Sequence, residues 1–146
     1  MQNWSTVKRI AVATLVAGTL DILAATGLTL AFGRKVDAML RYVASGPFPA
    51  AKEWGAAGAW AGLAVHFALM AVMAAVFVVT ANRMPQLKAK PILWGVIYGL
   101  VTYVVMNLVA VPLRFGTFPV SAIGISTQLF CHIVLVGIPI ALIARR

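Results

Sequence analysis

Residues 10–32 read IAVATLVAGTLDILAATGLTLAF, a run of 23 residues that is apolar except for one aspartate, some threonines and two glycines. A helix needs about 20 such residues to cross the roughly 30 Å hydrocarbon layer of a membrane. Because the run does not alternate between polar and apolar residues, it does not fit a strand of a membrane barrel. The run therefore predicts a membrane-spanning helix.

Three further runs of the same kind follow, and each predicts another membrane-spanning helix. The four expected spans cover residues 10–32, 54–81, 92–111 and 118–144. Pro85 is expected to close the second span, and Pro91 and Pro112 to bound the third, because proline cannot continue a helical hydrogen-bond ladder. The predicted fold class is an all-α bundle of four transmembrane helices, forming a single membrane domain over residues 1–146.

The composition excludes soluble and disordered proteins. Of the 146 residues, 62% are hydrophobic and only 10% are charged, and the mean hydropathy is +0.97. A soluble domain carries about 25% charged residues. The net charge of +9 comes from basic residues at the ends of the apolar runs, where they meet anionic headgroups. The lipid bilayer is therefore the expected partner, and nucleic acid is not.

Apolar residues recur at helical spacing shortly after the first span, at Val36, Met39, Leu40 and Val43. This period predicts an amphipathic helix, which we expect to lie in the membrane interface. Asp37 and Arg41 form an i,i+4 pair on its other face. The next residues, SGPFP at 45–49, break the helix and turn the chain back towards the second span.

The distribution of Lys and Arg favours both termini in the cytoplasm. Seven basic residues lie on the side of the termini: Lys8, Arg9, Arg83, Lys88, Lys90, Arg145 and Arg146. Five lie on the other side: Arg34, Lys35, Arg41, Lys52 and Arg114.

Three ionisable residues lie near the middle of predicted spans. Asp21 is central in the first, and His66 and His132 reach similar depths in the second and fourth. An aspartate at a span centre costs roughly 2.5–3.5 kcal/mol on insertion, so such a residue indicates a function or a specific partner. Each of the three lies on a helix face of small or polar residues. We therefore expect Asp21, His66 and His132 to converge within one protomer.

Other polar and small residues complete the predicted site. Gln128 shares a helix face with His132, and Tyr103 and Asn107 lie one turn apart in the third span. Small residues allow helix backbones to approach closely, and we expect this role for Gly18, Gly58, Gly62, Gly95 and Gly99.

The favoured function is the handling of protons, ions or a small solute by this polar cluster, because histidine titrates near neutrality. One alternative is a structural or assembly subunit that binds partner membrane helices or a second copy. Another is an electron-transfer subunit with haem between His66 and His132. The cluster offers at most three ligands to a metal, and nothing in the spacing requires one. No hydrolase, phosphate-binding or metalloenzyme motif is present, so an enzyme is not the favoured class.

The C-terminal 80 or so residues resemble the inner-membrane YagU family, a group of small multi-helix bacterial proteins. The landmarks run in the same order: His66, Met84-Pro85, Trp94-Gly95, Gly99, Pro112-Leu113, His132 and Arg145-Arg146. Gln128 stands near the place of an acidic residue in that family. The resemblance implies a four-helix protein of the bacterial inner membrane and implies no reaction.

Overall fold

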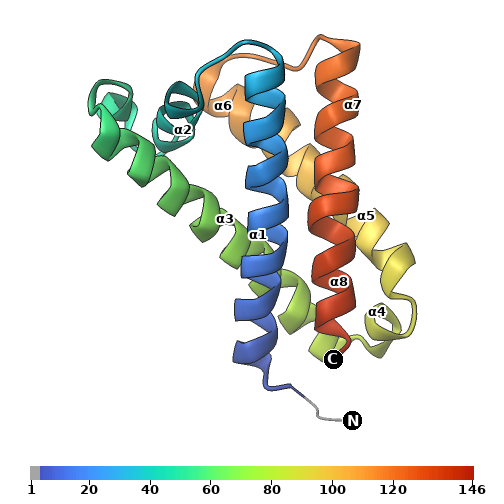
Figure 1. Ribbon diagram of the computed structural model, residues 1–146. Coiled ribbons are helices and arrows are strands. Elements are labelled where there is room, and N and C mark those ends of the chain that lie inside the picture. The colour runs from blue at the N-terminus through green and yellow to red at the C-terminus, as the bar shows by residue number, and fades with distance from the viewer. Residues whose placement is uncertain (1–3) are drawn as a thin grey trace.

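The computed structural model describes residues 4–146, and this part of the chain forms helices and turns without a strand. Four helices are long and apolar enough to cross a membrane: Thr6–Ala31, Ala56–Arg83, Pro91–Phe115 and Ala122–Ala144. They confirm the predicted all-α fold with four membrane-spanning helices (Figure 1).

The first two spans are the single helices α1 (Thr6–Ala31) and α3 (Ala56–Arg83). The third and fourth spans each consist of three consecutive segments. In the third these are α5 (Pro91–Tyr103), η2 (Val104–Ala110) and α6 (Val111–Phe115). In the fourth they are α7 (Ala122–Phe130), η3 (Cys131–Gly137) and α8 (Ile138–Ala144). The connections contain α2 (Val36–Ala44), η1 (Pro49–Glu53) and α4 (Pro85–Ala89).

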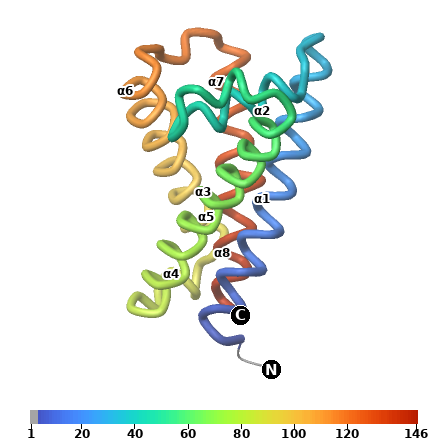
Figure 2. Tube along the Cα trace, turned by 90° about the vertical axis from the view of Figure 1, so that its left-hand side faces the viewer, coloured from blue at the N-terminus to red at the C-terminus, as the bar shows by residue number. Residues whose placement is uncertain are grey.

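The helices pack closely at one end of the bundle and spread apart at the other. Helix α1 packs against both α3 and α8, and α5 packs against η3 and α8. The first described residues and the C-terminus lie together at the narrow end, which we call the terminal end (Figures 1 and 2). We call the opposite end, where α2, α6 and the start of α7 lie, the open end.

The buried core lies in the terminal half and consists largely of small side chains. Its members are Ala13, Ala17, Met70, Ala74, Phe77, Val78, Ala81, Leu87, Val136, Ile140, Ala141 and Ala144. Glycines bring two backbones still closer, because a Cβ at Gly99 would lie 2.5 Å from the carbonyl oxygen of His132. A Cβ at Gly137 would overlap the backbone of Gly95. The third and fourth spans therefore cross in direct backbone contact.

Two prolines lie inside spans rather than at their ends. The prediction that Pro112 ends the third span is wrong, because the helix continues to Phe115. Pro112 and Pro139 each closely follow a π-helical segment, η2 and η3 respectively. The proline ring clashes with the carbonyl of residue i−4 and lacks an N–H. The wider π turns accommodate this defect, as local π adjustments do in other membrane helices.

The fourth span begins at Ala122 rather than at residue 118. The hydroxyl of Ser121 accepts a hydrogen bond from the Gly124 N–H, at 3.3 Å, and caps the helix there.

The predicted amphipathic helix is confirmed as α2. It packs along the first half of α3, where a Cβ at Gly62 would overlap the Leu40 carbonyl. The side chain of Arg41 lies against Gly58 and also pairs with Asp37 at 2.8 Å. Gly58 and Gly62, which were predicted to pack helices together, therefore allow α2 and η1 to pack closely against α3.

Candidate functional site

Asp21 on α1 and His66 on α3 lie side by side in the middle of the bundle. The Nδ1 atom of His66 is 3.8 Å from Oδ2 of Asp21. The other ring nitrogen, Nε2, donates a hydrogen bond to the Gly18 carbonyl at 2.9 Å. A Cβ at position 18 would lie 2.6 Å from the Phe67 ring, so any larger residue there would displace that side chain. The close α1–α3 contact thus fixes how the His66 ring faces Asp21.

The hydrogen-bond partner of His66 determines which ring nitrogen faces Asp21. A carbonyl oxygen can only accept, so Nε2 of His66 must carry its hydrogen. In neutral His66 the Nδ1 atom is then a bare lone pair, and it faces a carboxyl oxygen. Two acceptors repel each other, and a proton on either partner turns the contact into an attraction. A proton on either Asp21 or His66 would therefore stabilise this contact.

His132 has a different and complete set of partners. Its Nε2 accepts from the Asn107 amide at 3.2 Å, so its Nδ1 carries the hydrogen and donates to the Thr102 hydroxyl at 3.0 Å. The Thr102 hydroxyl in turn donates to the Gly99 carbonyl at 3.0 Å. The edge of the buried Tyr103 ring contacts the imidazole, with ring centroids 5.9 Å apart. Every polar group in this chain of bonds has a partner, so a further proton on His132 would break the bond to Asn107.

The predicted cluster is therefore divided among three places. Asp21 and His66 meet between α1 and α3, whereas His132 joins the third and fourth spans together with Asn107 and Tyr103. Gln128 belongs to neither group and lines a cavity between α1 and α7. Neither the Gly18 carbonyl nor Thr102 could be predicted as a histidine partner.

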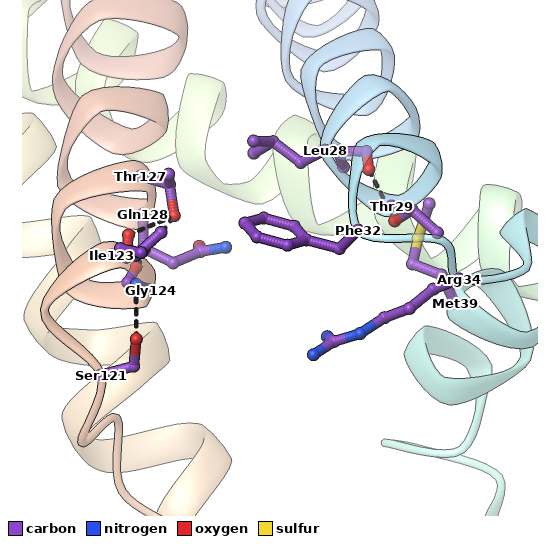
Figure 3. A pocket seen from close by; sticks show the side chains of 11 residues that line it. Leu28, Thr29, Phe32, Arg34, Met39, Ser121, Ile123, Gly124, Thr127 and Gln128 are labelled. Atoms are coloured by element: carbon purple, nitrogen blue, oxygen red, sulfur yellow. Dashed lines mark hydrogen bonds between the residues drawn. The ribbon is translucent and has the colours of Figure 1, made fainter.

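The cavity beside Gln128 has a volume of about 390 Å³ and lies between α1, α2 and α7 near the open end. In Figure 3 the Phe32 ring and the Arg34 side chain extend from one wall, and the Gln128 amide reaches across from the other. A second cavity of about 430 Å³ adjoins it and shares Leu28 and Thr127 with the first. We call the two cavities together the α1–α7 groove.

The α1–α7 groove follows the face of α1 that carries Asp21, although Asp21 lines neither cavity. Ala24, Ala25 and Leu28 line it, and they lie three, four and seven residues after Asp21. Residues at this spacing share one face of a helix. The Asp21 side chain keeps 21% of its surface exposed, whereas His66 keeps 10%. The acid of the pair is thus the partner that remains accessible.

A buried arginine closes the terminal end. Arg9 is 7% exposed and donates from Nη1 to the Ala144 carbonyl and from Nη2 to the Asn82 amide oxygen, both at 2.8 Å. Lys88 donates to the same amide oxygen at 3.0 Å. Burial, and then the charge of Arg9, lower the pKa of Lys88. The sequence analysis treated Arg9 only as an orienting charge, but it joins α1, α3 and α8.

Neither histidine fits the role of haem ligand. A bis-histidine haem needs one free ring nitrogen from each side chain. Nε2 of His66 is bonded to Gly18 and its Nδ1 faces Asp21, while both ring nitrogens of His132 are bonded. Within residues 4–146, no three His, Cys, Asp or Glu side chains lie close enough to hold a metal ion together.

Comparisons with known proteins return no relative: no family model, no curated protein and no solved structure matches the chain. The resemblance to the YagU family therefore stays a prediction.

Proposed function

We propose that this membrane protein binds and releases a proton at the Asp21–His66 pair and exchanges it with the open end of the bundle. The observation that carries the proposal is the orientation of His66. Its Nε2–H is held by the Gly18 carbonyl, so the opposite nitrogen presents a lone pair to the Asp21 carboxyl group. Intramembrane acids and histidines in such pairs are typical of proton relays.

The shape of the bundle supports access from one side. The α1–α7 groove runs from the open end along the face of α1 that carries Asp21. On the other side of the pair lie the close-packed core and the Arg9 network. A protein that moves protons across the membrane would alternate this arrangement with one open at the terminal end, as rocking helix bundles do.

The basic residues support an orientation for this exchange. The first described residues and the C-terminus lie at the terminal end, which also carries the larger group of Lys and Arg. By the positive-inside rule the terminal end would face the cytoplasm. The open end, and with it the α1–α7 groove, would then face outward from a bacterial inner membrane.

Proton flux into proteoliposomes tests the proposal. A pH-sensitive dye trapped inside the vesicles reports the internal pH after an external pH jump, with potassium and valinomycin present to prevent charge build-up. We expect the wild-type protein to speed equilibration and Asp21→Asn to return the rate to that of protein-free vesicles. Asp37→Asn is the matched control, because it makes the same change in an exposed acid of α2.

Two results would contradict the proposal. One is a wild-type rate equal to that of protein-free vesicles, which would favour the structural or assembly-subunit alternative. The other is equal flux through the wild-type and Asp21→Asn proteins. Thermal unfolding of both aspartate variants shows whether a lost flux reflects the missing carboxylate or a lost fold.

A further inference from the structure

We infer that the α1–α7 groove binds a single-chain amphiphile with an anionic headgroup, of the fatty-acid type. The headgroup lies at Arg34 and the chain runs down the groove towards the Asp21–His66 pair. The inference gives a ligand class for the groove beside the proposed proton site. It rests on the proposed function only where it connects ligand binding with proton binding. It draws on three features of the groove: its lining, its free charge and its size.

The lining changes from polar to apolar along the groove. At the open end Arg34, Ser121 and Gln128 provide charged and polar groups around the Phe32 ring (Figure 3). Deeper, the second cavity is lined by Ala24, Gly27, Leu28, Ser126, Phe130 and Cys131, among others. The Ser126 hydroxyl is turned back onto its own helix, where it donates to the Ala122 carbonyl at 2.7 Å. A ligand with a polar head and an apolar tail matches this order.

The charge at the mouth of the groove has no acidic partner. Over residues 4–146, the two ion pairs formed by aspartates join Asp37 to Arg41 and Asp21 to His66. Neither involves Arg34, whose guanidinium lies 6.0 Å from the centre of the Phe32 ring. A guanidinium binds carboxylate or phosphate oxygens with paired hydrogen bonds. Arg34 therefore selects an anionic headgroup.

The size of the groove favours one chain. Its two cavities, of about 390 and 430 Å³, each fall within the range of small-molecule pockets, which is about 300–1,000 Å³. From Phe32 to Ala24 the groove follows eight residues of α1, or about 12 Å of helix. Gly27 lines the second cavity and is exposed, and a Cβ there would meet no atom within 4 Å. A single extended chain would follow the two cavities in turn along α1.

Electron paramagnetic resonance with spin-labelled lipids tests the inference on the whole protein in phosphatidylcholine nanodiscs. Spin-labelled stearate, phosphatidylglycerol and phosphatidylcholine are compared at a pH where stearate is ionised. We expect the immobilised fraction to be largest for stearate. Arg34→Gln should weaken stearate binding about tenfold, as expected for loss of a charge-assisted contact. Lys35→Gln, the matched control, removes the neighbouring exposed charge, which does not line the groove, and should leave binding unchanged.

A second variant tests the apolar part of the groove. Gly27→Leu places a larger side chain in the second cavity and should reduce the immobilised fraction of stearate and of an uncharged spin-labelled alcohol alike. Arg34→Gln should affect only the stearate.

Three results would overturn the inference. The first is an equal immobilised fraction of stearate and phosphatidylcholine. The second is a larger immobilised fraction of phosphatidylglycerol than of stearate. The third is an equal effect of Arg34→Gln and Lys35→Gln on stearate binding. A groove filled by a second copy of the chain would instead give disulfide-linked dimers of Gly27→Cys in a Cys131→Ser background, which also contradicts it. If the wild-type protein does not bind stearate but its proton flux is intact, this inference alone is refuted. If the protein binds stearate but Asp21→Asn does not change the proton flux, the proposed function alone is refuted.

Discussion

The two histidines differ in what surrounds each ring nitrogen. His132 is bonded at both, to Thr102 and to Asn107, and so is fixed as a neutral link between two helices. His66 is bonded at one nitrogen and faces an acid with the other. The same residue type at similar depth thus has both ring nitrogens bonded in one place and one ring nitrogen facing an acid in the other.

Asn107→Leu is expected to destabilise the protein without abolishing proton flux. The substitution leaves Nε2 of His132 without a hydrogen-bond donor in a buried place, which costs about 1–3 kcal/mol. Chemical unfolding in detergent measures the loss, and the vesicle assay measures the flux. A large loss of flux in a protein that remains folded would show that His132 takes part in proton transfer.

The ionisable residues of the site could be identified from the sequence, but not which of the two histidines would pair with Asp21. Asp21 stood out because a central acid is costly in a membrane, and that reasoning needs no structure. The pairing depends on helix rotation and on which backbone carbonyl faces which ring. Gly18 was noted as a packing residue, but its carbonyl group, the partner of His66, has no signature in a sequence.

At the scale of the helices, glycines are of two kinds that look alike in the sequence. Gly99 contacts the backbone of the fourth span, whereas Gly27 faces open space in the α1–α7 groove. The GxxxG spacing of Gly95 and Gly99 predicted close packing at the right place. Pro112 misled the prediction of where the third span ends, because the π segment before it accommodates the proline and the helix continues to Phe115.

Alanine substitutions at the two kinds of glycine should have opposite effects. In Gly99→Ala the new Cβ would lie 2.5 Å from the His132 carbonyl oxygen, and we expect a loss of about 1–3 kcal/mol. In Gly27→Ala the Cβ meets nothing, and the lower backbone entropy of the unfolded chain should stabilise the protein by about 0.5–1 kcal/mol. Unfolding curves of the two variants and the wild type measure both changes in stability. Changes of the same sign would contradict the prediction.

Arg9 joins three helices at the terminal end, so its loss should loosen that end. Arg9→Gln removes charged donors to Ala144 and Asn82, and we expect a loss of at least about 1.5–3 kcal/mol. Lys8→Gln is the matched control, because Lys8 is the exposed neighbour and carries the same charge. Equal stability of the two variants in thermal unfolding would show that the Arg9 network contributes little.

At the scale of the whole molecule, the hydrophobic runs and the charge pattern were enough to predict the four-helix fold. They could not predict that the bundle is closed at the terminal end and divided by the α1–α7 groove at the other. That shape depends on where small side chains meet across helices, as in the core around Ala17, Ala74 and Ala141. Hydropathy gives each helix its length but not its tilt.

The proposed orientation predicts which positions a reagent outside the cell can reach. In a Cys131→Ser background, Val120→Cys at the open end should react with a membrane-impermeant maleimide on intact bacterial spheroplasts. Arg146→Cys at the terminal end should react only after permeabilisation. Both positions are exposed, so burial does not confuse the comparison. The reverse pattern would place the open end in the cytoplasm.

The single proton that we propose for the Asp21–His66 pair would also have an electrical consequence. With His66 neutral, the empty pair carries one negative charge and the loaded pair carries none. A transmembrane voltage acts on charge, with about 2.3 kcal/mol for each elementary charge that crosses 100 mV. In the proposed cycle the loaded form would therefore reorient without electrical work, whereas the voltage would act on the charge of the empty form. Because the pair lies in the middle of the bundle, a proton that reaches it would also cross part of the field, so voltage would influence loading as well as the return of the vacant site.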